Sequence, residues 1–196
     1  MAAVMRIILA VSFAGFCLLA GGALAERQPR HMLDRPKLVH NALDAPVYPV
    51  CSVGGRQAAC LRSEACTSQG GRFTGFCAGD PTLVCCVVEK TCDDETSAHS
   101  VTFRNPSFPL ENLRPRLCPL MIKVGRDICS MRVDMNVFEL EPATKSGCIF
   151  DMFVILGTVE GPTASLCGNM TGFATTFAVK ELSDVTLSLV AQAMEG

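Results

Sequence analysis

Six of the twelve cysteines lie between residues 51 and 86, and this density limits what the segment can fold into. A unit this small cannot bury enough apolar surface to be stable by packing alone. Each disulfide contributes about 2–4 kcal/mol, so three of them would dominate its stability. The adjacent Cys85 and Cys86 are expected to bond two different partners, but the number of cysteines leaves the pairing open. We therefore predict a small disulfide-stabilised module over residues 51–86.

The first residues indicate the compartment in which these cysteines are oxidised. Arg6 precedes an apolar run over residues 7–20, and Ala23-Leu24-Ala25 has the pattern that signal peptidase cleaves. The run is shorter than the roughly 20 residues of a transmembrane helix, although a retained signal anchor is the alternative. We predict a signal peptide over residues 1–25, secretion, and no membrane span after signal cleavage.

Removal of the signal peptide changes the cysteine count. Cys17 leaves with it, so an odd number remains and at least one thiol lacks an intrachain partner. Such cysteine density in an exported chain is typical of a disulfide framework. The formal net charge of −2 is mild and mixed in sign, which argues against nucleic acid or an anionic membrane as a partner.

Two further segments follow the predicted signal peptide. Residues 26–50 hold four prolines, charges of both signs and no cysteine, and we interpret them as a flexible linker or pro-segment. From Cys92 onward the pattern changes to short strands in which apolar and polar residues alternate, as in Met131, Val133 and Met135. Similar alternation marks Leu120, Ile122, Val124, Val185, Leu187 and Leu189. The stretch 150–156 is apolar on both faces except at Asp151, which predicts a central strand. Residues 92–196 are therefore expected to form an all-β sandwich.

Several motifs in this strand-rich segment carry a resemblance. They are the turn Asn105-Pro106-Ser107-Phe108-Pro109, the sequence Cys148-Ile149-Phe150-Asp151, and Cys167-Gly168. Together with Cys92 and Cys118 they resemble the CUB domain, a jelly-roll β-sandwich found in many secreted and matrix proteins. The resemblance implies the disulfides Cys92–Cys118 and Cys148–Cys167, and it leaves Cys129 unpaired within the domain. The family continues into a final strand beyond the part that resembles this chain, so we expect a longer product or an open sheet edge that another chain covers.

The finer resemblance is to arthropod-type CUB proteins, in which a short cysteine-rich module ending in Cys-Cys precedes the domain. Residues 128–134 and the turn 167–172 are similar to theirs. The cysteine order of residues 51–86 also resembles the clip units of arthropod serine-protease cascades. That resemblance implies three pairings, Cys51–Cys85, Cys60–Cys77 and Cys66–Cys86.

Two candidate sites lie in the sandwich segment. Glu141 and Asp151 occupy two positions of the CUB-type calcium site, and calcium prefers several carboxylate oxygens. No third acidic residue matches, so the alternative is that Asp151 bonds a turn, and we expect no resident cofactor other than this candidate calcium. Asn169-Met170-Thr171 is an acceptor sequence for N-glycosylation in a predicted turn.

No catalytic motif is recognisable. His31, His40 and His99 lie in polar stretches, and neither G-x-S-x-G nor H-E-x-x-H occurs. The cysteines form no C-x-x-C pair, so zinc is not expected. We expect a non-enzymatic binding or scaffold protein that recognises an extracellular protein or glycan. The alternative is a regulator of extracellular proteolysis, either a clip-like cofactor or a protease inhibitor.

Overall fold

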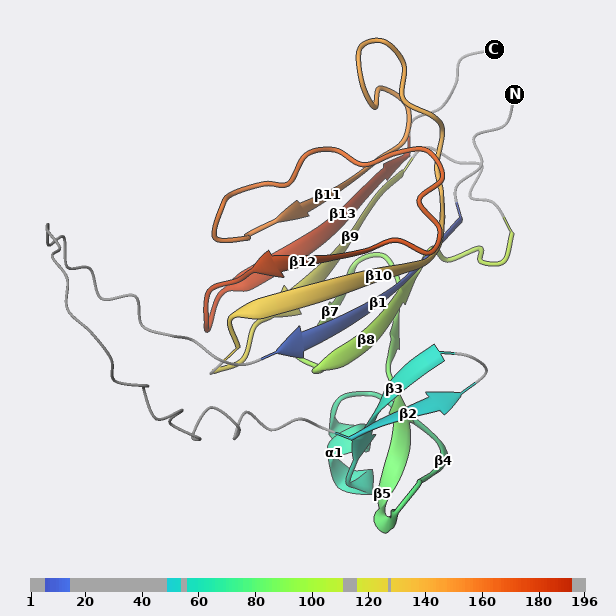
Figure 1. The fold of residues 1–196 in the computed structure, drawn as a ribbon, viewed down its shortest axis with the longest axis vertical. Helices are drawn as coiled ribbons and strands as arrows, with labels where there is room; N and C mark the ends of the chain where they lie inside the picture. Colours follow the sequence, from blue (N-terminus) through green and yellow to red (C-terminus); the bar gives the residue numbers. More distant parts are fainter. Residues whose placement is uncertain (1–5, 15–48, 54–55, 111–115, 127, 192–196) are drawn as a thin grey trace, which may run out of the picture.

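The structure is a computed structural model that describes residues 6–14, 49–53, 56–110, 116–126 and 128–191 (Figure 1). Of the predicted linker over residues 26–50, only residues 49 and 50 are described. The predicted cleavage site after Ala25 also lies outside the described residues.

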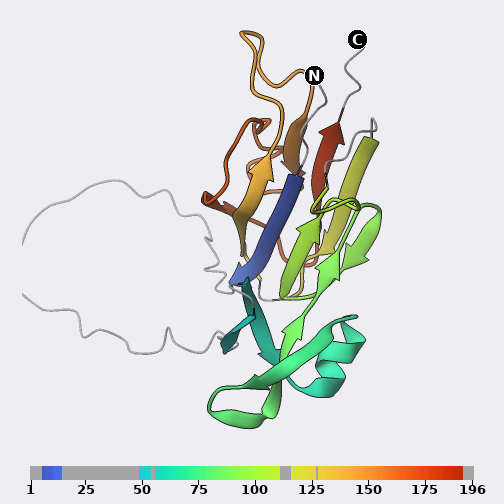
Figure 2. The same ribbon diagram turned by 90° about the vertical axis from the view of Figure 1, so that its right-hand side faces the viewer.

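Residues from 89 onward, together with residues 6–14, form two facing sheets whose strands pair mostly antiparallel, which confirms the all-β sandwich (Figures 1 and 2). The five-stranded sheet has the order β12 (Ala174–Ala178), β10 (Ser130–Glu139), β1 (Arg6–Ala14), β8 (Ser100–Arg104) and β6 (Glu89–Lys90). The four-stranded sheet has the order β11 (Met152–Leu156), β13 (Asp184–Ala191), β9 (Arg116–Lys123) and β7 (Asp94–Thr96).

The alternating residues face the space between the sheets, as the sequence predicts. In β10, Met131, Val133 and Met135 are buried while Arg132 is exposed. The facing sheet buries its alternating residues in the same way. They are Leu120 and Ile122 of β9 and Val185, Leu187 and Leu189 of β13. Because side chains alternate between the two faces of a strand, one apolar face from each sheet makes the core.

The prediction of a central strand over residues 150–156 is wrong. β11 begins at Met152 and lies at the edge of the four-stranded sheet. Its free edge is covered by a loop, since the N–H of Phe153 donates to the carbonyl of Leu166 at 2.8 Å and the N–H of Leu166 donates back at 2.9 Å. Phe153 and Ile155 are buried, Met152 and Val154 are half-buried, and Leu156 is exposed, so apolar residues on both faces did not indicate a central position.

Residues 6–14, which lie in the predicted signal peptide, form strand β1 in the middle of the five-stranded sheet. β1 pairs antiparallel with β10 on one side and with β8 on the other. Figure 2 shows it, in blue, between these two strands. It comes from a segment far upstream of its neighbours in the sequence, and signal cleavage after Ala25, which stays a prediction, would remove it.

The module consists of a four-stranded sheet in the order β2 (Val50–Val53), β3 (Arg56–Leu61), β5 (Asp80–Val87) and β4 (Arg72–Cys77), with the short helix α1 (Ser63–Ser68) beside it. It joins the sandwich directly. Leu61, Val84 and Val88 belong to the same buried cluster as Val101 and Phe103 of β8. The two units therefore share part of one core.

Gly71 gives a prediction for the module. A Cβ atom at this position would collide with the Sγ of Cys86 and lie 2.8 Å from the Sγ of Cys66, which form a disulfide with each other. Gly71→Ala is therefore expected to cost roughly 2–4 kcal/mol, the contribution of one disulfide. Thiol titration of this variant should detect more free thiols than the wild type has, whereas Ser68→Ala on the exposed face of α1 should add none. A Gly71→Ala protein with normal stability and an intact Cys66–Cys86 bond would contradict this close packing of Gly71 against the disulfide.

In the described part of the chain, none of the helices is long and apolar enough to cross a membrane.

Candidate functional site

Three disulfides crosslink the module, and they are the three pairings that the clip-type resemblance implies. Cys51 bonds Cys85, Cys60 bonds Cys77, and Cys66 bonds Cys86. The adjacent cysteines 85 and 86 point to opposite faces of β5, because neighbouring side chains alternate along a strand. Each face of the strand is thereby fixed to a different part of the module.

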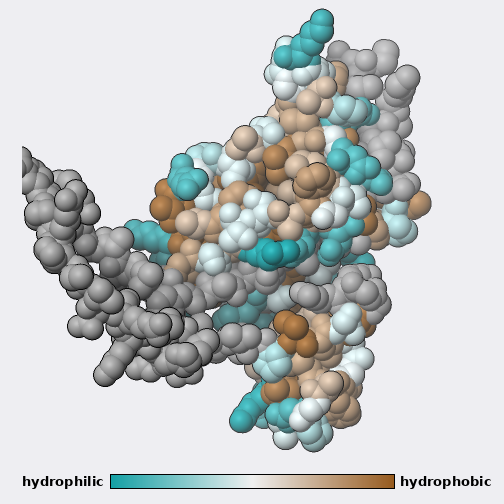
Figure 3. Space-filling model, in the orientation of Figure 1, coloured by the Kyte–Doolittle hydropathy of each residue, from teal (hydrophilic) through white to brown (hydrophobic). Residues whose placement is uncertain are grey.

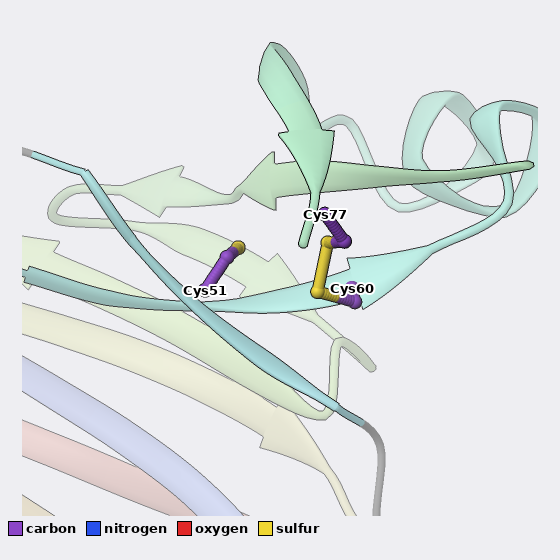
Figure 4. A group of neighbouring side chains, drawn as sticks. All are labelled: Cys51, Cys60 and Cys77. Carbon is purple, nitrogen blue, oxygen red and sulfur yellow. A yellow bond between two sulfur atoms is a disulfide. The ribbon is translucent and has the colours of Figure 1, made fainter. Parts of the chain in front are cut away.

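The sulfurs of Cys51, Cys60 and Cys77 lie within 4.8 Å of one another (Figure 4). A metal ion is bound by thiolates, and these three sulfurs are all engaged in disulfides. With Cys85, these cysteines form most of a small second core together with Ala58. The cluster therefore acts as packing for the module.

The module exposes a pair of phenylalanines on β4. The rings of Phe73 and Phe76 meet edge to face with centroids 5.3 Å apart, and the residues are 54% and 69% exposed. Figure 3 shows apolar surface on the module below the sandwich. β4 is an edge strand, so backbone groups beside the rings are also open to a partner. We call Phe73 and Phe76 the aromatic pair.

The neighbours of the aromatic pair hold β4 in place. Arg72 forms a salt bridge with Glu89 at 2.7 Å, and Arg104 of β8 reaches the same Glu89 oxygen at 3.3 Å. The hydroxyl of Thr74 donates to the carbonyl of Cys85 at 2.9 Å, and Cys77 ends the strand in its disulfide. The pair is thus displayed on a strand that is tied both to the module and to the sandwich.

The sandwich contains the two disulfides that the CUB resemblance implies, Cys92–Cys118 and Cys148–Cys167. The prediction that Cys129 stays unpaired is wrong, because Cys129 is disulfide-bonded. The odd count arose from assigning Cys17 to the signal peptide, whereas the whole chain has twelve cysteines, an even number. Every described cysteine is oxidised, and such disulfide-rich frameworks are typical of extracellular proteins.

The calcium candidates lie together in the connection between β10 and β11. Asp151 is fully buried, and its Oδ2 accepts a hydrogen bond of 3.3 Å from the N–H of Glu141. The carbonyl of Glu141 accepts from the N–H of Gly168 at 3.0 Å. Within the described residues, no third acidic or histidine ligand joins the two carboxylates. Asp151 therefore bonds a turn, the alternative given by the sequence, and calcium binding stays a prediction.

Asn169 is exposed and lies in a turn, where a glycan has room. Its Oδ1 accepts from the N–H of Thr171 at 3.1 Å. The hydroxyl of Thr171 in turn accepts from the N–H of Phe138 at 2.9 Å. The acceptor sequence is therefore folded against the end of β10, and its glycosylation stays a prediction.

Of the three histidines, only His99 lies in the described part of the chain. It is half-buried between β7 and β8, although its stretch of the sequence is polar. Burial lowers its pKa because the charged imidazolium loses hydration.

The lowered pKa of His99 predicts a loss of stability in acid. Below about pH 6.5 the imidazole is protonated in the unfolded chain but resists protonation in the folded chain. The unfolded state then binds more protons, so the free energy of unfolding falls as the pH falls. We expect the denaturant midpoint to drop less between pH 7.5 and pH 5.5 in His99→Gln than in the wild type. Equal drops in the two proteins would show that His99 does not contribute.

An apolar pocket of about 330 Å³ lies beside the edge strand β12. Met135, Leu166, Met170, Phe173 and Phe177 contribute apolar side chains to it. It lies between β12 and the loop around Leu166 that covers the edge of β11.

Comparisons with known proteins add nothing to this geometry. No protein-family model, curated protein or solved structure matches the chain. Function therefore has to be inferred from the surfaces described above.

Sequence reasoning did not identify the aromatic pair. A signal was present, because Phe73 and Phe76 are the only aromatic residues between Cys51 and Cys86 and they flank Gly75 in an otherwise polar, glycine-rich stretch. A module whose core consists largely of cystine has little interior to receive two phenylalanine rings.

Proposed function

We propose that the protein is a secreted, non-enzymatic binding protein whose module docks an extracellular protein through the aromatic pair on β4. The observation that carries the proposal is the exposure of both rings on a disulfide-anchored edge strand. A CUB-like identity of the sandwich is part of the same proposal. Its support is the pair of disulfides Cys92–Cys118 and Cys148–Cys167 together with the two-sheet architecture.

Three physical arguments favour a protein as the partner. Aromatic side chains that become buried at the centre of an interface contribute a large share of its binding energy. A rigid display lowers the ordering cost of binding, and β4 is held by Cys77 and by the Arg72–Glu89 salt bridge. The open edge of β4 can also pair with an extended segment of the partner.

Secretion is supported by the chemistry of the cysteines. Five disulfides join ten described cysteines, and such bonds persist in oxidising compartments. The predicted signal peptide is the second support. The predicted glycan on the exposed Asn169 is consistent with export.

The test compares three tagged proteins purified from the medium of secreting cells. They are the wild type, Phe73→Ser/Phe76→Ser, and Phe173→Ser as a matched control, since Phe173 is 62% exposed on the sandwich. We expect the wild type and the control to capture the same extracellular proteins. The double variant should capture at least about tenfold less of them. Equal capture by all three, or no reproducible partner, would refute the proposal. Circular dichroism and thiol titration establish that each variant is folded and oxidised.

A second candidate function is regulation of extracellular proteolysis, which the pairing order of the module favours. The bonds 51–85, 60–77 and 66–86 follow the order that the clip-type resemblance implies. The secreted protein should then change the rate at which a serine-protease zymogen in extracellular fluid becomes active. Unchanged activation, together with unchanged activity of the mature protease, would remove this candidate and leave the first one intact.

A further inference from the structure

The position of β1 defines a strand-sized slot in the sandwich. Residues 6–14 pair with 130–139 of β10 along their whole length, and residues 8–12 pair with 100–104 of β8. β8 and β10 do not pair with each other, because β1 lies between them. The sheet is continuous only while an extended segment occupies this position.

Removal of β1 would leave a gap in the middle of the sheet. Adjacent strands are about 4.8 Å apart, so β8 and β10 would be separated by roughly twice that distance. Val101 and Phe103 on one side and Met131 and Val133 on the other, which are now at most 2% exposed, would face the gap. Both strands would also present unpaired backbone N–H and C=O groups, which are costly when they are not hydrogen-bonded.

The pairing register indicates which residue types a segment in the slot needs at each position. Residues 9, 11 and 13 of β1 stand opposite the inward-facing Met135, Val133 and Met131. In the sequence these positions are leucine, valine and phenylalanine, while residues 10 and 12 between them are alanine and serine. A segment that fits is therefore extended, apolar at alternate positions and small in between.

We propose that the slot between β8 and β10 is a peptide-binding site that takes one strand from a second, different polypeptide after signal cleavage has removed residues 6–14. The donor strand runs antiparallel to both neighbours and restores the central strand by β-augmentation. The inference rests on the export that is part of the proposed function. The site is separate from the aromatic pair, which lies on the module.

The experiment uses the protein secreted from cells that express the full chain. The intact mass of the purified protein should show that residues 1–25 are absent. A fluorescent peptide with the sequence of residues 6–14 and added lysines for solubility should then bind it. The matched peptide with Val11→Pro should bind at least about tenfold more weakly, because proline lacks the backbone N–H that a central strand needs. Hydrogen exchange at 101–103 and 131–133 should slow when the first peptide binds.

Four results would overturn the proposal. They are a secreted protein that retains residues 6–14, equal or absent binding of the two peptides, slow exchange at 101–103 and 131–133 in a peptide-free monomer, and a homodimer whose slot is filled by a second copy. The Phe73→Ser/Phe76→Ser protein should bind the peptide as the wild type does. The experiments therefore distinguish a failure of the proposed docking through the aromatic pair from a failure of the proposed peptide binding in the slot.

Discussion

Replacing Phe153 by alanine is expected to lower the free energy of unfolding of the sandwich by about 3–5 kcal/mol. Phe153 of β11 is fully buried, and its ring meets Phe138 of β10 edge to face with centroids 5.8 Å apart. The two rings come from opposite sheets, so the contact joins the two layers of the core. The alanine leaves a cavity and also removes the aromatic contact, which contributes about 0.5–1.5 kcal/mol beyond its buried area.

Denaturant unfolding followed by circular dichroism measures this loss, since the chain has no tryptophan and one tyrosine and gives little intrinsic fluorescence change. Phe173→Ala is the matched control. Phe173 is 62% exposed, and its replacement should change stability by about 0.5 kcal/mol or less. Equal destabilisation by the two variants would contradict the placement of Phe153 between the sheets.

Removal of the Cys60–Cys77 disulfide by a double alanine substitution is expected to unfold the module while the sandwich persists. Its loop of 17 residues corresponds to about 3 kcal/mol of chain entropy. Both cysteines are also buried in the second core, where few other apolar side chains contribute. A unit of this size has little burial with which to offset the loss.

Hydrogen exchange resolved along the chain measures the outcome. Amides of β3 and β4 should exchange freely in Cys60→Ala/Cys77→Ala, while those of β13 stay protected. Cys148→Ala/Cys167→Ala is the control, because its loop of 19 residues is nearly the same length but lies in the sandwich. Protected β3 and β4 amides in the first variant would show that the module is stable by packing.

The strands of the sandwich could be predicted from sequence because one face of each strand is buried. Met131, Val133 and Met135 alternate with polar residues, and the same alternation marks Leu187 and Leu189 in β13. Such a pattern fixes both the element and its inward face. The sequence also allowed the turn that Asp151 bonds near Glu141 to be predicted, because polar residues next to strand ends commonly bond backbone groups.

Other features depend on contacts that a local pattern does not contain. The apolar run that forms β1 has the composition of a signal-peptide core, and only the strands on either side give it a place in a sheet. The stretch around Phe153 has the apolar composition of a central strand, and only the strand order shows that it lies at an edge, where it pairs with Leu166. The exposure of Phe73 and Phe76 follows from the shortage of interior in the module, which depends on how the cysteines pair.

The central claim is that a fixed set of disulfides holds this two-part β protein together. Peptide mapping of the secreted, unreduced protein by mass spectrometry tests it most directly, with backbone fragmentation between Cys85 and Cys86 to separate their partners. The account predicts that Cys85 is joined to Cys51 and Cys86 to Cys66, together with the pairs 60–77, 92–118 and 148–167. A bond between Cys85 and Cys86 themselves, or any of these ten cysteines reduced in a folded protein, would contradict it.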